Sequence, residues 1–126
     1  MKTKKKISIL KKLLVVVVAL SMLMLMSNTA FAAIHTRGSN TSTLYKHSTY
    51  ADGSTSTGIT GARCLVIVTA FNNSGSGETN YADNIGSAYT FSNASGGYCD
   101  HATSYHRVYE TDLSGSTTYY EYNLQE

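Results

Sequence analysis

The stretch ARCLVIVTAF, residues 62–71, decides the fold class expected for this chain. Its side chains are largely β-branched or aliphatic, and the loop sequence NNSGSG follows directly. A short apolar run that ends in turn residues predicts a buried β-strand, because a helix would repeat apolar residues at intervals of three and four over a longer segment. We therefore expect the fold to be built around this strand.

Both faces of this predicted strand are apolar, since successive side chains of a strand point to opposite sides. One face carries Cys64, Val66, Val68 and Ala70, and the other carries Leu65, Ile67 and Phe71. We expect a second sheet to cover one face, and a loop, the segment 34–40 or a partner chain to cover the other. The alternative is that Leu65, Ile67 and Phe71 form a surface for self-association.

Four further segments have the β-branched and aromatic composition of strands. They are residues 43–50, 87–92, 98–110 and 116–124. The intervening sequences have the composition of turns and loops: ADGSTSTG at 51–58, NNSGSGETN at 72–80 and NASGG at 93–97. The pattern predicts an all-β fold, a small single-domain antiparallel β-sandwich or barrel.

The expected hydrophobic core is small. Residues 33–126 contain 13 Leu, Ile, Val and Phe side chains, together with all ten tyrosines of the chain. A buried tyrosine removes a large apolar area from water while its hydroxyl finds a polar partner. We therefore expect tyrosine to supply the missing core volume.

The N-terminus has the features of an export signal. A lysine-rich start precedes a 14-residue apolar run over residues 13–26, and the small-residue sequence AFA follows. This arrangement predicts a secretory signal peptide, and the run is short for a membrane span. We predict a signal peptide over residues 1–32, cleaved after Ala32 and touching the membrane only before cleavage, and a single small β domain over residues 33–126. The signal is similar to those of Gram-positive bacteria, and the expected localisation is secreted and extracellular.

Basic side chains are concentrated in the predicted signal peptide, whereas the acidic side chains lie in the remainder of the chain. Six of the ten Lys and Arg residues lie in the predicted signal peptide. Residues 33–126 keep four basic and all eight acidic side chains, so their net charge is −4, although the whole chain carries +2. Binding of nucleic acid requires basic side chains that neutralise phosphates. The sequence therefore predicts no nucleic-acid partner.

The stretch YCDHATSYHRVYE, residues 98–110, holds most of the side chains capable of chemistry. One face of this predicted strand includes Cys99 and carries a candidate binding surface formed by His101, Tyr105, Arg107 and Tyr109. His106 points to the opposite face, so a regular strand cannot direct it and His101 toward one metal ion. We expect no metal site, no cofactor and no catalytic residue.

Two cysteines in a chain with an export signal predict one disulfide. Cys64 and Cys99 lie on the two longest predicted strands, which are either neighbours in one sheet or face each other across the fold. We expect these residues to be linked. Cysteine catalysis would require a thiolate beside a histidine instead.

These observations predict a non-enzymatic secreted domain that acts by binding. Tyrosines among Ser, Thr and Asn suit adaptable polar recognition. The expected partner is an extracellular or cell-surface target, either a cell-envelope component or a glycan. In its export signal, size class and tyrosine-rich end, the chain resembles lactococcin-type bacteriocins, which implies an antagonistic peptide as a further form of binding.

Two alternatives belong to other functional classes. The first is a surface or matrix protein that self-associates, and the second is a small secreted ribonuclease. Tyr45-Lys46-His47 resembles the Tyr-x-His element of fungal guanyl-specific ribonucleases. That resemblance implies general acid–base chemistry. The residues recruited to complete such a site would be Glu78, Arg63 or Arg107, and His101 or His106.

Overall fold

A computed structural model describes residues 31–112 and 114–126 of the chain. Almost all of the predicted signal peptide therefore lies outside the described residues. The first strand, β1 (Phe31–Arg37), begins two residues before the predicted cleavage site. No helix with the length and hydrophobicity of a membrane span is present in the described ranges.

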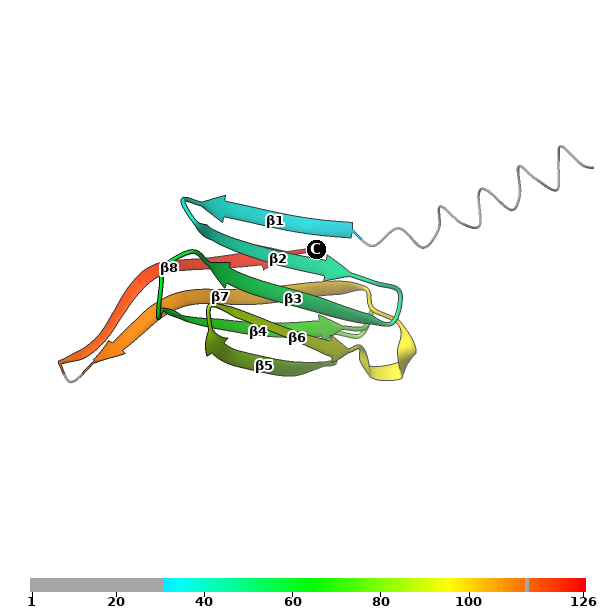
Figure 1. Ribbon diagram of the computed structural model, residues 1–126. Helices are drawn as coiled ribbons and strands as arrows, with labels where there is room; N and C mark the ends of the chain where they lie inside the picture. Colours follow the sequence, from blue (N-terminus) through cyan, green and yellow to red (C-terminus); the bar gives the residue numbers. More distant parts are fainter. Residues whose placement is uncertain (1–30, 113) are drawn as a thin grey trace, which may run out of the picture.

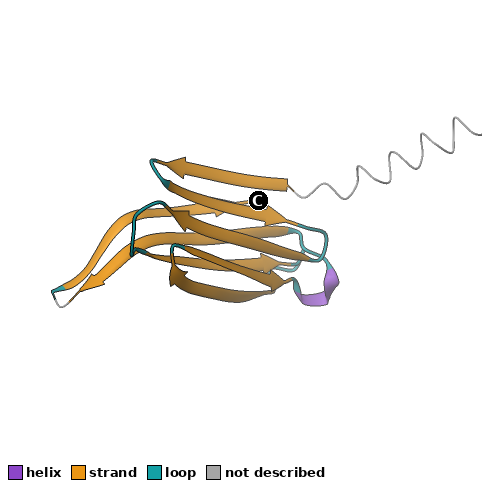
Figure 2. Cartoon of the chain, viewed as in Figure 1, coloured by secondary structure: helices purple, strands orange, loops and turns teal. Residues whose placement is uncertain are grey.

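The chain forms two four-stranded antiparallel sheets in a sandwich-like arrangement (Figures 1 and 2). Sheet A contains, in spatial order, β1, β2 (Asn40–Lys46), β3 (Tyr50–Thr57) and β6 (Ser87–Asn93). Sheet B contains β5 (Gly77–Ile85), β4 (Arg63–Phe71), β7 (His101–Asp112) and β8 (Gly115–Gln125). One short 3-10 helix, η1 (Ser95–Gly97), precedes β7. The all-β prediction is confirmed.

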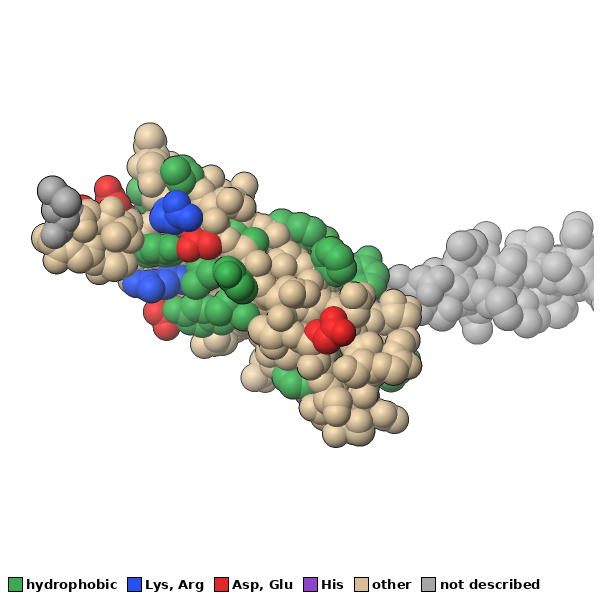
Figure 3. Space-filling model, turned by 90° about the horizontal axis from the view of Figure 1, so that it is seen from below, with side chains coloured by type: hydrophobic (Ala, Val, Ile, Leu, Met, Phe, Trp, Pro, Cys, Tyr) green, Lys and Arg blue, Asp and Glu red, His purple; other side chains and the backbone are tan. Residues whose placement is uncertain are grey.

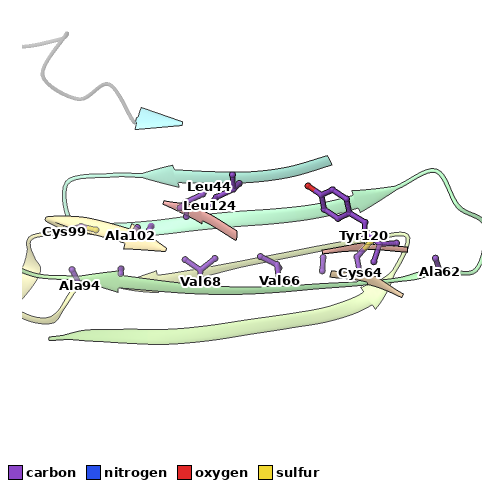
Figure 4. Packing of buried hydrophobic residues seen from close by; sticks show 14 residues of the cluster. Leu44, Ala62, Cys64, Val66, Val68, Ala94, Cys99, Ala102, Tyr120 and Leu124 are labelled. Carbon is purple, nitrogen blue, oxygen red and sulfur yellow. The ribbon is translucent and has the colours of Figure 1, made fainter. Parts of the chain in front are cut away.

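The core lies between the sheets and is centred on β4 (Figure 4). The strand alternates as predicted, since the four side chains of its inner face are fully buried: Cys64, Val66, Val68 and Ala70. Leu44 of β2 and Val108 of β7 are also fully buried, and alanines fill much of the remaining core. The apolar volume between the sheets is therefore small.

Tyrosine does not supply the missing core volume, so this prediction was wrong. Among the described residues, Tyr120 is the only tyrosine in the buried core. Alanine, glycine, serine and threonine face inward on sheet A and reduce the volume that has to be filled. Tyr81 and Tyr89 are 74% and 59% exposed, on the outer faces of the sheets.

The sequence 51–58, predicted to be a loop, instead forms most of β3. Ala51, Gly53 and Thr55 point into the core, and the polar side chains between them face outward. A Cβ atom at Gly53 would lie 2.8 Å from Cγ2 of Val68, so glycine allows sheet A to approach β4 closely. Small inward residues suit this narrow space, although their composition is that of a turn.

The sequence 72–80 was also predicted to be a loop, and only its first part is one. The side-chain oxygen of Asn72 accepts hydrogen bonds from the backbone N–H groups of Ser74 and Ser76, both at 3.0 Å, which closes the turn. β5 begins at Gly77 and pairs with β4 along its full length. β5 is an edge strand with mostly exposed side chains, so the apolar alternation that marks a half-buried strand is weak.

Sheets A and B are joined through a buried imidazole. His106 of β7 is fully buried, and its Nδ1 atom lies 2.8 Å from Oγ1 of Thr55 in β3. Because the Thr55 hydroxyl donates to the carbonyl oxygen of Leu65 at 2.9 Å, Nδ1 of His106 donates to Thr55. Nε2 then accepts from the hydroxyl of Ser104 at 2.6 Å. Both ring nitrogens are thus satisfied by a neutral imidazole.

Candidate binding surface

The residues predicted for binding and those predicted for self-association lie on one continuous face. In the pairing of β4 with β7, Leu65 is opposite Arg107, Ile67 is opposite Tyr105 and Phe71 is opposite His101. Arg63 is opposite Tyr109 at the same end of the sheet as Leu65. We call this set the sheet B surface: Arg63, Leu65, Ile67, Phe71, His101, Tyr105, Arg107 and Tyr109.

No other part of the described chain forms a layer over the sheet B surface. The segment 34–40, one of the three alternatives expected to cover it, lies in β1, the following turn and the start of β2 in the opposite sheet. Leu65 and Ile67 are half-buried by their neighbours alone. In the view of Figure 3, hydrophobic side chains gather beside Lys or Arg and Asp or Glu side chains toward the left-hand end of the molecule.

β5 adds residues to this face that the sequence analysis missed. Tyr81 pairs with Ile67, and Ile85 pairs with Arg63, so both extend the sheet B surface. They are 74% and 67% exposed, respectively. The sequence contains a signal for them, because Tyr81, Asp83 and Ile85 alternate at the spacing of a strand.

A charged network fixes one end of the sheet B surface. Nε of Arg63 donates to Oδ1 of Asp83 at 3.0 Å, and the Tyr109 hydroxyl donates to the other oxygen of the same carboxylate. Hydrogen bonding to Tyr109 and the charge of Asp83 raise the pKa of Arg63, which therefore remains positively charged. Three strands contribute to this network, so these side chains are ordered before any partner arrives.

Arg107 lies at the centre of the charged end. Its guanidinium is 4.7 Å from the centre of the Tyr109 ring, in a cation–π contact. Nε donates to the Thr118 hydroxyl at 2.8 Å, and Nη2 donates to the Ser116 hydroxyl at 3.2 Å. Both hydrogen-bond partners are neutral hydroxyls, and the acidic Glu121 of β8 is the direct cross-strand neighbour of Arg107.

The opposite end of the surface is aromatic. His101 is exposed and stacks on Phe71 with 4.6 Å between ring centres and 8° between ring planes. Nδ1 of His101 lies 3.2 Å from a carboxylate oxygen of Asp100. The imidazole therefore extends the apolar row of β4 and also offers a polar edge.

The two histidines of β7 lie on opposite sides of sheet B. His101 is on the outer face, whereas His106 is enclosed between the sheets. Among the described residues, no three His, Cys, Asp or Glu side chains form a group that could hold a metal ion.

The Ser104–His106 contact has the composition of a nucleophile and its base. However, Ser104 is 4% exposed and His106 is fully buried, so a substrate has no access to either atom. Burial lowers the pKa of His106 to about 4, and a backbone hydrogen bond with Ser54 opposes this shift only in part. The pair therefore satisfies buried polar groups and stays uncharged at neutral pH.

The disulfide prediction was wrong, because Cys64 and Cys99 are separate buried thiols. Cys64 lies near the start of β4, whereas Cys99 precedes His101, which pairs with Phe71 at the far end of that strand. The seven residue steps from Cys64 to Phe71 span about 23 Å along the strand, and a disulfide requires Cα atoms within about 7 Å. Figure 4 shows the two cysteines at opposite ends of the core.

The predicted position of Cys99 also needs correction. It was expected on the same strand face as His101, but β7 begins only at His101. Cys99 is buried and His101 is exposed, because the chain turns from the loop into the strand between them.

We expect both thiols to be unreactive in the folded protein. Burial raises the pKa of Cys64 to about 11, with a further contribution from the negative charge of Asp83, and burial also raises the pKa of Cys99. Reagents attack the thiolate, which is scarce at neutral pH under these conditions. A thiol-specific reagent should titrate almost no thiol in the native protein and two after denaturation. Rapid modification of one native thiol would contradict the described burial.

The residues recruited for a ribonuclease site are not brought together. Tyr45 lies in β2 of sheet A and His47 follows in the connection to β3, whereas Arg63, Arg107 and His101 are on the outer face of sheet B. His106 is enclosed between the two sheets.

The fold and the surface together describe a small all-β protein with an exposed face rich in tyrosine and arginine. No protein-family model, curated protein or solved structure matches this chain. The functional argument therefore rests on the geometry of this surface.

Proposed function

We propose that the chain is an exported β-sandwich domain that acts by binding an extracellular or cell-surface target through the sheet B surface. The observation that carries the proposal is the register of β4 and β7, which joins Tyr105, Arg107 and Tyr109 to Leu65 and Ile67 on one uncovered face. Export rests on the predicted signal peptide.

The composition of this face supports recognition of a partner. Tyrosine and arginine are the residue types that most often dominate binding energy, particularly beside apolar neighbours that exclude water. The network of Arg63, Asp83 and Tyr109 holds its side chains in place, which reduces the ordering cost of association. A cell-envelope component or glycan and an antagonist's receptor are the target classes consistent with the predicted export.

The test is binding of the labelled purified protein to intact Gram-positive cells and to arrayed cell-envelope glycans. The double variant Tyr105→Ser/Arg107→Ala should bind at least about tenfold more weakly, since it removes an aromatic and a cationic anchor. The control, Thr41→Ala/Ser56→Ala, changes the outer face of sheet A and should bind like the original protein. Equal binding by both double variants, or no saturable binding to any of these materials, would refute the proposal.

Self-association is a second candidate because the same face exposes apolar side chains on β5. Tyr81 and Ile85 extend the row formed by Leu65 and Ile67. Size-exclusion chromatography at increasing protein concentration distinguishes the two functions. A concentration-dependent dimer that the Ile67→Glu variant cannot form would favour self-association.

The ribonuclease alternative has no such support from the geometry. A fluorogenic RNA assay tests it directly. Turnover that disappears in a His47→Ala variant would restore it.

A further inference from the structure

The outer face of sheet A collects aromatic side chains around one carboxylate. Asp52 of β3 has Tyr45 of β2 and Phe91 of β6 as its direct cross-strand neighbours. Tyr50 precedes Asp52 by two positions on the same strand, and Tyr89 precedes Phe91 by two positions on its strand. Side chains at these positions share one face of a sheet and are within reach of each other.

The central groups of this cluster are fixed by direct contacts. The rings of Tyr50 and Phe91 meet at nearly a right angle, with 6.4 Å between centres and 82° between planes. His47 stacks on Tyr50 with 4.1 Å between ring centres, and its Nε2 atom lies 2.5 Å from Oδ1 of Asp52. The aromatic corner and the carboxylate beside it are therefore already arranged without a ligand.

The cluster is open to solvent above a largely buried charge. Phe91 and Tyr89 are 49% and 59% exposed, whereas the side chain of Asp52 is only 16% exposed. Burial first, and then the negative charge of Asp52, raise the pKa of Tyr89.

Exposed aromatic rings around a largely buried carboxylate do not contribute favourably to the stability of the fold. Phe91 is one of three phenylalanines in a chain whose core is small, yet half of its side chain faces water. The faces of aromatic rings carry partial negative charge and attract cations, and the Asp52 carboxylate adds a full negative charge beside them. A metal ion would need several oxygen or nitrogen ligands, whereas one carboxylate among rings suits a large and weakly hydrated cation.

We propose that this cluster, His47, Tyr50, Asp52, Tyr89 and Phe91, is a binding site for an organic cation that carries a quaternary or alkylated ammonium group. The cation lies in the corner between Tyr50 and Phe91 and faces the Asp52 carboxylate. A corner of two rings surrounds a compact cation better than it supports the flat face of a neutral sugar. This site is on the opposite side of the molecule from the sheet B surface, so the two proposals succeed or fail separately.

The probe is choline, and its neutral isostere 3,3-dimethylbutan-1-ol is the matched control ligand. Both are titrated at constant ionic strength into the purified isotope-labelled protein, and amide chemical shifts are recorded by NMR. Choline should cause saturable shifts in β3 and β6 around Asp52 and Phe91. The neutral isostere, which keeps the shape and lacks the charge, should bind at least about tenfold more weakly.

Variants separate the charge from the rings. Asp52→Asn keeps an oxygen that accepts from His47 and should weaken choline binding about tenfold, and Phe91→Leu should weaken it about fivefold. Glu78→Gln removes a carboxylate from β5 and should leave the affinity unchanged. Spectra of the variants without ligand establish that each one is folded.

Three results would overturn the cation site. The first is equal affinity for choline and its neutral isostere, which indicates a merely apolar patch. The second is unchanged choline binding by Asp52→Asn. The third is no saturable shift up to about 0.1 M choline, because the cation–π contacts and the carboxylate should give measurable affinity within that range.

Discussion

Acidification from about pH 7.5 to about pH 4 is expected to lower the free energy of unfolding by about 3 kcal/mol, because His106 is buried in its neutral form. Both of its ring nitrogens are satisfied by Thr55 and Ser104 without a second ring proton. Protonation in the folded state would place an unpaired charge between the sheets. A loss of this size is a large part of the roughly 5 to 15 kcal/mol that stabilises a typical domain.

The sign follows from the two protonation equilibria. Burial lowers the pKa of His106 in the folded state to about 4, whereas an unfolded chain restores the ordinary value of 6.5. Between these values the unfolded state binds a proton that the folded state excludes, so stability falls as the pH falls. The contribution is complete above about pH 6.5 and is lost by about pH 4.

Urea unfolding at a series of pH values measures this effect, and one double variant isolates its source. Ser104→Ala/His106→Phe replaces both members of a buried hydrogen bond with apolar groups, and the Thr55 hydroxyl keeps its bond to Leu65. The double variant should therefore fold and lose most of the pH dependence between about pH 4 and 6.5.

Asp112 contributes a second pH dependence of stability, which is the same in the original protein and in the double variant. Hydrogen bonds from Ser114 lower the pKa of this exposed carboxyl, so it also loses stabilising interactions as the pH falls. The difference between the two proteins therefore reports His106. If both proteins show the same pH dependence, the assignment to His106 is wrong.

The sequence could predict those features that depend on alternation along one strand. The inward face of β4 and the opposite orientations of His101 and His106 both follow from the two-residue period of a strand. With the exception of Arg63, the eight side chains of the sheet B surface were identified in the same way, as two separate groups. That these groups are neighbours depends on the pairing of β4 with β7, which is set by contacts distant in sequence.

β3 was not predicted because the contacts that favour a strand there come from residues distant in sequence. Gly53 is required by the closeness of Val68, and Thr55 by the carbonyl of Leu65 and the imidazole of His106. Neither requirement is visible in the local composition, which is that of a turn. The Asp52 cluster on the other side of β3 was missed for the same reason.

The disulfide is excluded by the pairing of β4 with β7, which was one of two arrangements left open by the sequence. Cys64 and Cys99 are both near the start of their strands, and antiparallel neighbours place their starting ends at opposite ends of the sheet. The cysteine count and the predicted export signal favoured a bond that antiparallel pairing of these two strands excludes.

Gly77→Ala is expected to destabilise the protein by about 3 kcal/mol, at the upper end of the range for overpacking. Gly77 begins β5 opposite Phe71, and a Cβ atom there would lie 2.2 Å from the carbonyl oxygen of Ala70. Because the obstacle is backbone of the central strand, it cannot rotate away as a flexible side chain would. Alanine also restricts the unfolded chain, but that gain is only about 0.4 to 1 kcal/mol and does not offset the clash.

Gly75→Asn is the matched control in the same connection. Gly75 has a φ of 80° and no atom within 4 Å of an added Cβ, so its requirement is conformational, and asparagine tolerates that conformation. The control should lose about 1 kcal/mol or less, whereas Gly77→Ala should also accelerate hydrogen exchange of the β5 amides, since the strand has to move away from β4. Equal stability of the two variants, with β5 amides protected in both, would mean that β5 does not begin at Gly77 against Ala70 and Phe71. The Tyr81 and Ile85 side of the sheet B surface would then lose its structural basis, because both residues are positioned by that pairing.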